Sequence, residues 1–268
     1  MAKLRLDLLL HMKGMAASRE KARAMILAGE VKVNGLCLDK PGSSVDEEAE
    51  ITVEPSRPKY VSRGGFKLEK AIMDFGIDFS QKTVLDVGAS TGGYTDCALK
   101  NGAKKVYALD VGYGQLDWTL RNDPRVVNIE RTNIRYFSAE DLGEKLDIVT
   151  IDVSFISTAL VFPVIKGFLK DDGLVISLVK PQFEAGREKV GKKGVVRDPE
   201  VHQEVLRNCI DYARKENLHC SAATFSPIKG PKGNMEFFIL LKKQAEPGID
   251  IEEMAALTVK RAHIFFGG

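Results

Sequence analysis

The sequence has few of the residues that build metal or disulfide frameworks, and it has no long hydrophobic run. Its 268 residues include four cysteines and four histidines, without any Cys-x-x-Cys pair. This spacing argues against a disulfide framework and a zinc cluster, so we expect no metal site. The apolar runs are far shorter than the ~20 residues of a membrane-spanning helix. The N-terminal segment carries acidic Asp7 inside its apolar run, unlike a signal peptide, and we expect a cytosolic protein.

A strong net charge is also absent, because 39 Lys and Arg stand against 37 Asp and Glu. The charges are nevertheless clustered. Residues 1–36 have a net charge of +4 and residues 37–54 one of −5, and the segments 57–70 and 180–197 each return to +4. Basic clusters attract a polyanion such as RNA. For any single cluster, a solvated surface is the simpler interpretation.

The first 56 residues predict a small separate domain. The apolar run 6–10 favours a short helix, and Ser18 is a typical N-cap for a second helix that Gly29 ends. Apolar residues share one face of the second helix, whereas Arg19 and Arg23, four residues apart, share another. Two strand-like segments follow, VKVNG and EITVEP, the first with an Asn-Gly turn.

This N-terminal segment resembles the S-four RNA-binding domain. The resemblance rests on RLDLLL, SREKARAMILAGEVKVNG and EITV in that order, and it covers about fifty residues. It implies a domain that binds structured RNA, which indicates a class of substrate but no reaction. The basic residues that it suggests as phosphate contacts are Arg5, Arg19, Lys21, Arg23 and Lys32.

Pro55 and Pro58 predict a linker, since two prolines so close together interrupt any helix or strand. We therefore expect a first domain at 1–56, a linker at 57–60 and a second domain at 61–268. In the second domain, strand-like segments from TVLDVG to GLVISLV alternate with helical patterns, and two more strand-like segments and a helical tail follow. This alternation predicts an α/β fold, with a mostly parallel sheet covered by helices on both faces.

A glycine-rich segment, LDVGASTGGYTD, directly follows the first predicted strand of that sheet. Its glycines let the backbone turn sharply and approach a ligand closely. It lacks the middle glycine of a dinucleotide fingerprint, which disfavours NAD, and the Gly-Lys-Ser/Thr of a Walker loop. Asp110 ends the second strand 24 residues after Asp86, where a carboxylate can accept both hydroxyls of a ribose.

This DxGxxxGG segment with a second-strand acid resembles class I S-adenosylmethionine-dependent methyltransferases. The resemblance implies S-adenosylmethionine as the cofactor and a Rossmann-like sheet. The alternative is a turn whose glycines serve packing alone. The residues assigned to the cofactor are Asp86, Gly88, Ala89, Ser90, Gly92, Gly93 and Asp110, together with Asn133 and Ile134 after the third strand.

Four charged residues stand in otherwise apolar or glycine-rich segments: Lys67 in SRGGFKLEKA, Asp152 in TIDVSFIS, Lys180 in SLVKPQFE and Glu236 in KGNMEFF. Asp152 and Lys180 end strand-like segments, so we expect both at the carboxyl edge of the sheet, where open α/β folds bind ligands. The order Lys-Asp-Lys-Glu resembles the catalytic tetrad of FtsJ/RrmJ-type RNA ribose 2′-O-methyltransferases. A single such lysine would be interpreted as a surface charge, but four matches inside longer matching segments disfavour that.

With both domains taken together, the chain resembles the TlyA family. The matching segments are YVSRGGFKLEKA, DVGASTGGYTD, ALDVGYGQL, IDVSFIS, LVKPQFEAGR, GKKGVVRDP and GPKGNMEFF. The resemblance implies methylation of cytidine riboses in ribosomal RNA, free or within a ribosomal subunit. We take Lys180 as the proton acceptor for the 2′-hydroxyl, with Lys67 offsetting part of the effect of the two carboxylates.

Further RNA contacts are expected at Arg63 and in a basic, glycine-interleaved loop that contains Arg187, Lys189, Lys192 and Lys193. A solvated loop is an equally good interpretation of the latter. Two other functions stay open. The haemolysin label given to the family would imply a membrane-lytic protein, which the lack of a span or signal peptide disfavours. A non-catalytic RNA-binding protein on a methyltransferase fold is disfavoured by the intact tetrad and glycine-rich segment.

Overall fold

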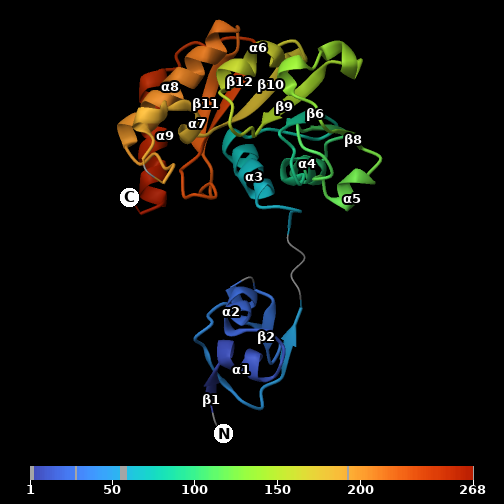
Figure 1. Cartoon of the computed structure of the whole chain (residues 1–268), viewed down its shortest axis with the longest axis vertical. Helices are drawn as coiled ribbons and strands as arrows, with labels where there is room; N and C mark the ends of the chain where they lie inside the picture. Colours follow the sequence, from blue (N-terminus) through green and yellow to red (C-terminus); the bar gives the residue numbers. More distant parts are fainter. Residues whose placement is uncertain (1–2, 28, 55–58, 192, 268) are drawn as a thin grey trace. The chain divides into compact units, whose positions relative to one another are not determined.

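The computed structural model describes residues 3–27, 29–54, 59–191 and 193–267. The chain divides into two compact units, Met1–Lys59 and Tyr60–Gly268 (Figure 1). Residues 57 and 58 of the expected linker lie outside the described residues.

In the residues that the structure describes, the first unit contains two short helices and two small sheets. Its elements are β1 (Lys3–Arg5), α1 (Leu6–Met12), α2 (Arg19–Leu27), β2 (Val31–Val33), β3 (Leu36–Cys37), β4 (Ser44–Asp46) and β5 (Ile51–Val53). β1 pairs with β4, and β2 lies between β3 and β5. Ser18 Oγ accepts the Lys21 N–H at 3.2 Å, which confirms the predicted N-cap of α2. Asn34 and Gly35 form the predicted turn with φ of 49° and 80°.

The second unit contains the larger sheet. Its strands are β6 (Thr83–Val87), β7 (Lys105–Leu109), β8 (Val126–Ile129), β9 (Leu146–Ile151), β10 (Leu169–Val179), β11 (His219–Phe225) and β12 (Phe237–Lys242). Its α-helices are α3 (Gly64–Phe75), α4 (Gly93–Lys100), α5 (Trp118–Arg121), α6 (Phe162–Ile165), α7 (Pro181–Glu184), α8 (Pro199–Lys215) and α9 (Ile251–Phe265). Short 3₁₀ turns are η1 (Ile134–Tyr136), η2 (Ala139–Leu142), η3 (Thr158–Leu160) and η4 (Arg187–Lys189).

The sheet has the order β11-β12-β10-β9-β6-β7-β8. β12 runs antiparallel to both of its neighbours, and the other pairs are parallel. The predicted α/β class and mostly parallel sheet are therefore confirmed. The chain order reverses between β6 and β9, and such a reversal is where open α/β sheets bind ligands, outside the carboxyl ends of the strands.

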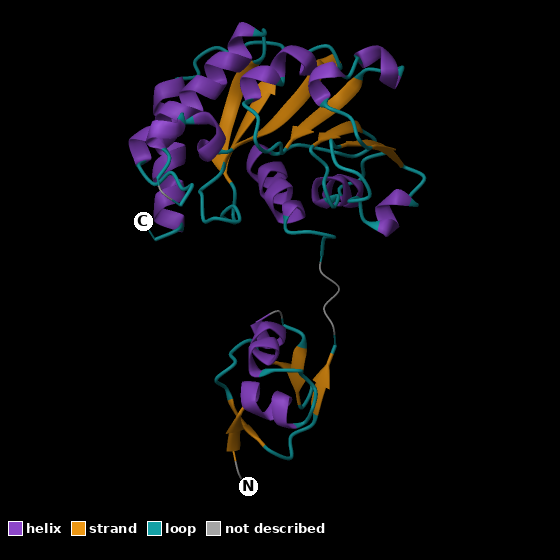
Figure 2. Cartoon of the chain, viewed as in Figure 1, coloured by secondary structure: helices purple, strands orange, loops and turns teal. Residues whose placement is uncertain are grey.

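Helices cover both faces of this sheet (Figure 2). Alternate residues of each strand enter different cores, because successive side chains of a strand point to opposite faces. Leu85 and Val149 pack in the core that contains residues of α8 and α9, whereas Val84 and Ile148 pack in the core that contains residues of α3 and α4. The adjacent strands β6 and β9 are thus buried on both faces, and their carboxyl ends lie together at one edge.

Candidate active site

The glycine-rich segment and Asp152 meet at the reversal point of the sheet. Gly88 follows β6, and Asp152 follows the neighbouring strand β9, where its N–H donates to the carbonyl of Val87 at 2.9 Å. Gly88 has a φ of +89°, and a Cβ on it would lie 2.6 Å from the carbonyl oxygen of Asp152. Only glycine fits this turn, because a side chain would be both strained and in collision.

Four charged side chains form a row of alternating sign at this edge. Nζ of Lys67, on α3, donates to Oε2 of Glu236 at 2.6 Å and lies 3.8 Å from Oδ2 of Asp152. Nζ of Lys180, which follows β10, lies 2.6 Å from Oδ1 of Asp152 and donates to Oγ of Ser154 at 2.8 Å. The structure thus brings together all four residues that the sequence singled out.

This row is largely removed from water. Lys67 is 9% exposed, Lys180 8% and Glu236 1%. Burying a charge is costly unless it is paired, and removing one partner leaves an uncompensated charge behind. The row therefore holds its four side chains in fixed positions.

Three cavities surround the row. The large cavity, of about 770 Å³, is lined by residues that include Ser90, Asp110, Asn133, Ile134 and Asp152. The small cavity, of about 240 Å³, is lined by residues that include Arg63, Lys67, Gly88, Ala89, Gly93 and Asp152. The aromatic cavity, of about 350 Å³, is lined by residues that include Ser154, Phe155, Lys180, Phe183 and Glu236. Each cavity thus shares at least one wall residue with the row.

Asp110 is fixed at the rim of the large cavity. Its Oδ2 accepts the Ser90 N–H at 2.8 Å, and its Oδ1 accepts the Gly112 N–H at 2.7 Å. A carboxylate oxygen can accept more than one hydrogen bond. Acceptor capacity for the hydroxyls of a ribose therefore remains, and the backbone bonds set the direction of the carboxylate.

Asp86 occupies a different position from the other residues assigned to the cofactor. It is 1% exposed, and its two oxygens accept hydrogen bonds from Thr95 Oγ1 at 2.7 Å and Thr150 Oγ1 at 3.1 Å. Burial raises the pKa of Asp86 to about 7. The carboxyl joins β6, β9 and α4 beneath the glycine-rich segment.

The other glycines of the segment allow protein elements to pack closely. A Cβ on Gly93 would lie 2.2 Å from Oγ of Ser62, and a Cβ on Gly92 would lie 2.3 Å from Cδ1 of Leu120. Packing is thus a real function of these glycines. It is compatible with ligand binding, because Gly93 also lines the small cavity.

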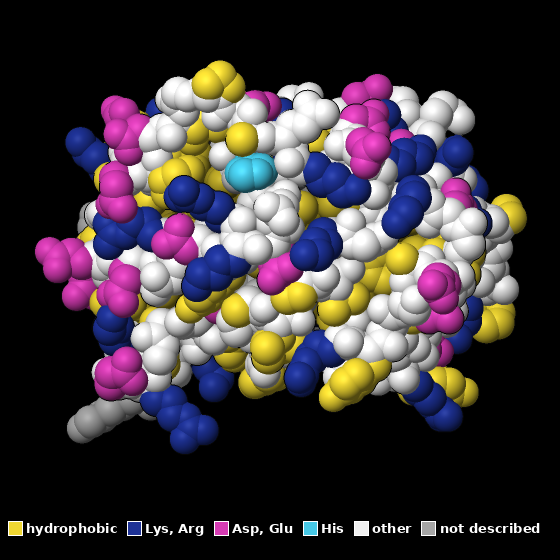
Figure 3. Space-filling model, turned by 90° about the horizontal axis from the view of Figure 1, so that it is seen from above, with side chains coloured by type: hydrophobic (Ala, Val, Ile, Leu, Met, Phe, Trp, Pro, Cys, Tyr) yellow, Lys and Arg dark blue, Asp and Glu magenta, His cyan; other side chains and the backbone are white. Residues whose placement is uncertain are grey.

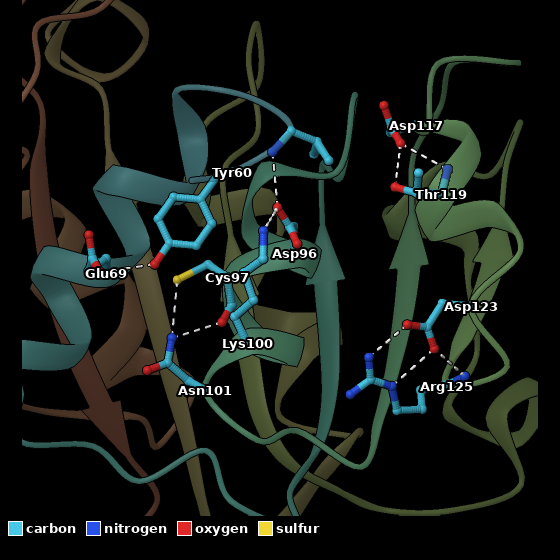
Figure 4. Close-up of polar contacts among 11 residues, drawn as sticks. Tyr60, Glu69, Asp96, Cys97, Lys100, Asn101, Asp117, Thr119, Asp123 and Arg125 are labelled. Atoms are coloured by element: carbon cyan, nitrogen blue, oxygen red, sulfur yellow. Dashed lines mark hydrogen bonds and ion pairs between the residues drawn. The ribbon is translucent and has the colours of Figure 1, made fainter. Parts of the chain in front are cut away.

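Asp96 lies on α4 and binds the backbone at the beginning of the second unit (Figure 4). Its Oδ2 accepts the Val61 N–H at 2.9 Å and pairs with Lys100 Nζ at 2.8 Å. The hydroxyl of Tyr60 donates to Glu69 on α3 at 3.0 Å. These contacts hold residues 60–65 beside the glycine-rich segment, so that Arg63 reaches the wall of the small cavity.

The sequence interpretation missed two residues of the aromatic cavity, Phe155 and Phe183, and the carboxylate of Glu184, which follows Phe183 in the sequence. Phe155 has a φ of +65°, is 90% exposed, and its ring centroid lies 5.0 Å from that of Phe183. Glu184 accepts the Ser157 hydroxyl at 2.7 Å and the Thr158 N–H at 2.8 Å, and burial raises its pKa. Phe155, Phe183 and Glu184 lie within IDVSFIS and LVKPQFEAGR, but nothing in their spacing marks them as cavity residues.

The basic residues expected to bind RNA are mostly on the surface. Arg5, Arg19, Lys21 and Arg23 are exposed, whereas Lys32 pairs with Glu54 at 2.7 Å. In the second unit, Lys189 is held by Glu204 of α8, and Lys192 lies outside the described residues. On the face that Figure 3 shows, Lys and Arg are interspersed with Asp and Glu, and they do not form one continuous basic surface.

Among the described residues, no helix has the length and apolar character needed to cross a membrane.

The strand order, with the cavities and the paired charges at its reversal point, defines an S-adenosylmethionine-dependent methyltransferase of class I, preceded by a small α+β domain. Comparison with known families agrees. Residues 60–243 match the FtsJ-like methyltransferase family, and residues 4–51 match the S4 domain. The chain belongs to the TlyA family, in which these two domains are joined.

Two curated relatives and one solved structure illustrate the similarity. "Putative rRNA methyltransferase YqxC" of Bacillus subtilis is 49% identical over 97% of this chain and 94% of its own. "16S/23S rRNA (cytidine-2'-O)-methyltransferase TlyA" of Mycobacterium tuberculosis is 43% identical over 90% of this chain and 91% of its own. The structure titled "Putative hemolysin from Streptococcus thermophilus" has a TM-score of 0.74 at 42% identity and covers 100% of this chain and 98% of its own.

Proposed function

We propose that this chain transfers a methyl group from S-adenosylmethionine to the 2′-hydroxyl of a cytidine ribose in ribosomal RNA. The observation that carries the proposal is the row of paired charges, Glu236–Lys67–Asp152–Lys180, between the large cavity, which holds Asp110 in its wall, and the aromatic cavity. The names of the curated relatives support ribosomal RNA as the substrate and cytidine as the target.

The residues around the large and small cavities fit the cofactor. Asp110 would accept the ribose hydroxyls of its adenosine, and Asn133 and Ile134 would lie beside the adenine, since all three line the large cavity. Gly88, Ala89, Ser90 and Gly93 line the small cavity, which suits the amino-acid end. Gly92 and Asp86 would act by supporting this loop. When bound, the cofactor supplies an electrophilic methyl group on a sulfonium.

Lys180 is the proposed proton acceptor. A ribose hydroxyl is a poor nucleophile, and its proton must leave as the new carbon–oxygen bond forms. Nζ of Lys180 is fixed by Asp152 and Ser154 at the wall of the aromatic cavity. Lys67 and Glu236 hold the opposite side of Asp152, so that the acceptor nitrogen is positioned before substrate arrives.

The aromatic cavity is the proposed site of the target nucleotide. Proteins that modify or read single nucleotides in RNA stack the splayed base on aromatic side chains. Phe155 offers such a surface because it is 90% exposed, and it lies against Phe183 at the cavity wall. Its neighbour Ser154 binds Lys180 at 2.8 Å, so a base on Phe155 would bring its ribose near the acceptor.

Basic residues of both units would hold the surrounding RNA. In the first unit, we assign phosphate contacts to Arg5, Arg19, Lys21, Arg23 and Lys32. In the second unit, we assign them to Arg63, Arg187, Lys189 and Lys193, and the sequence adds Lys192. Such contacts supply affinity without base specificity. A ribosomal RNA substrate also implies a cytosolic location.

The test is methyl transfer from labelled S-adenosylmethionine to isolated ribosomal subunits and to naked ribosomal RNA, followed by mapping of 2′-O-methyl sites. Label on a cytidine ribose is the expected result, and the better of the two substrates identifies the natural one. Label on a base alone would overturn the proposed acceptor atom. Lysis of red cells without any methyl transfer would favour the membrane-lytic alternative.

A further inference from the structure

One carboxylate of the first unit binds two of the arginines expected to contact RNA. Asp7 lies in the first turn of α1 and is 0% exposed. Its Oδ1 accepts Nε of Arg5 at 3.0 Å, and its Oδ2 accepts Nη2 of Arg5 at 3.0 Å and Nη2 of Arg19 at 3.2 Å. A fully buried acid therefore connects the strand before α1 with the start of α2.

The backbone around Asp7 leaves these side chains little freedom. The Asp7 N–H donates to the Pro41 carbonyl at 3.0 Å, and the Leu6 N–H to the Ser43 carbonyl at 2.9 Å. Gly42 lies between Pro41 and Ser43 in the chain, and a Cβ on it would lie 3.3 Å from Nη1 of Arg5. The Arg5 guanidinium thus lies between its bidentate partner and a close segment of backbone.

Both arginines remain available to a ligand. Their side chains are 54% and 49% exposed, against 0% for Asp7. A guanidinium carries five N–H donors, of which Arg5 uses two on Asp7 and Arg19 one. The cluster keeps a net charge of +1, and its remaining donors suit the several acceptor oxygens of a phosphate.

We propose that Asp7 is a positioning residue that holds Arg5 and Arg19 as one preorganised site for a phosphate of the RNA backbone. This inference rests on the RNA binding of the proposed function. Arginines that are already fixed lose less conformational freedom when a phosphate binds, which raises affinity. The Arg5 hydrogen bonds also hold the pKa of Asp7 at about 2, so the carboxylate stays charged at neutral pH.

Replacing Asp7 distinguishes a positioning role from a simple charge effect, because the two predict opposite changes in affinity for RNA. Asp7→Asn removes a negative charge from a surface that binds a polyanion, so general electrostatics predicts tighter binding. Positioning predicts weaker binding, since the amide holds two guanidinium groups poorly. We expect a loss of about 3- to 30-fold, with the slope of log affinity against log salt reduced by about 0.7 to 0.9 for one lost phosphate contact.

The experiment measures binding of the full chain to naked ribosomal RNA at several salt concentrations. Glu47→Gln is the matched control, because it removes the same charge from an exposed side chain of the same unit. It is expected to bind equally or more tightly. Arg5→Lys is the second variant, and it is decisive if Asp7→Asn unfolds the unit. It keeps Asp7 and the charge but cannot form the bidentate pair, and we expect weaker binding here as well.

Weaker binding of both Asp7→Asn and Arg5→Lys, beside an unaffected Glu47→Gln, would support the inference. Affinity within twofold of the parent for Arg5→Lys, or tighter binding for a folded Asp7→Asn, would overturn it while leaving the proposed function intact. A parent chain that binds no ribosomal RNA would overturn the proposed function and this inference together.

Discussion

The carboxylate of Asp152 lies 2.6 Å from the ammonium of Lys180, at the carboxyl ends of the adjacent strands β9 and β10. Parallel neighbours bring these ends together, so the sheet itself sets the spacing of the pair. Mutation of Lys180 can separate the binding of substrate from the methyl-transfer step. Lys180→Ala should retain cofactor and RNA binding but lower turnover, because a group used in the transition state affects rate more than affinity.

The expected loss for Lys180→Ala is about 10²- to 10⁴-fold, the usual contribution of a positioned general base. Single-turnover methyl transfer to ribosomal subunits would measure it. Lys180→Arg is the sharper variant, since it keeps the positive charge but does not give up its proton. Near-parental transfer by the arginine variant would show that Lys180 acts by charge or position, and a harmless Lys180→Ala with an inactive Lys67→Ala would reassign the base to Lys67.

Sequence patterns predicted the parts of this protein that depend on regular spacing. The central strands of the large sheet alternate with helices and are buried on both faces, so they appear as short apolar runs. Asp152 and Lys180 directly follow two such runs. The strands β1, β3 and β4 were missed because KLR, LC and SVD lack the paired β-branched residues that mark the equally short β2 (VKV) and β5 (ITV).

What the sequence could not provide were contacts between distant segments. The bond from Lys67 to Glu236 joins residues 169 positions apart, and only the fold brings them together. Phe155 was missed for a related reason. An exposed aromatic residue with positive φ contradicts local preference, and its place in the wall of the aromatic cavity is visible only in the folded structure.

Asp110 provides a test of the cofactor site. Asp110→Ala should weaken binding of S-adenosylmethionine, because a pair of hydrogen bonds to a carboxylate is lost, worth about 1.5–3 kcal/mol each in favourable cases. Calorimetry without RNA measures this directly. Asp117→Ala is the control, since Asp117 caps α5 and hydrogen-bonds Thr119. Equal affinity of parent and Asp110→Ala would remove Asp110 from the site.

Phe155 provides a test of the nucleotide site. Phe155 lines the large cavity as well as the aromatic one, so the test is made at saturating S-adenosylmethionine. Under that condition Phe155→Ala should lower kcat/KM for RNA about 5- to 150-fold, which corresponds to roughly 1–3 kcal/mol for the loss of one base stack. The control is Tyr136→Ala, which removes an aromatic ring that is 79% exposed on η1. Equal losses in both variants would mean that aromatic surface in general, rather than the aromatic cavity, binds the RNA.

The raised pKa of Asp86 predicts that the stability of the second unit depends on pH. Burial raises its pKa to about 7 in the folded state, from an ordinary value of 3.8. Between these values the folded chain binds more protons than the unfolded chain, so the contribution of Asp86 to stability is greatest below about pH 4 and is lost as the pH rises towards 7. Within that window, the maximal slope is about 1.4 kcal/mol per pH unit.

Asp86→Asn should remove this dependence, because the amide has nearly the shape of the carboxyl group but does not titrate. Urea unfolding at pH 5, 6, 7 and 8 would measure the free energy of unfolding of the parent and the variant. The parent should lose stability relative to Asp86→Asn as the pH rises, since only the parent must bury a charge between Thr95 and Thr150. Parallel curves over this range would show that Asp86 is already ionised in the folded protein at pH 5, with its charge stabilised by the two threonine hydroxyls.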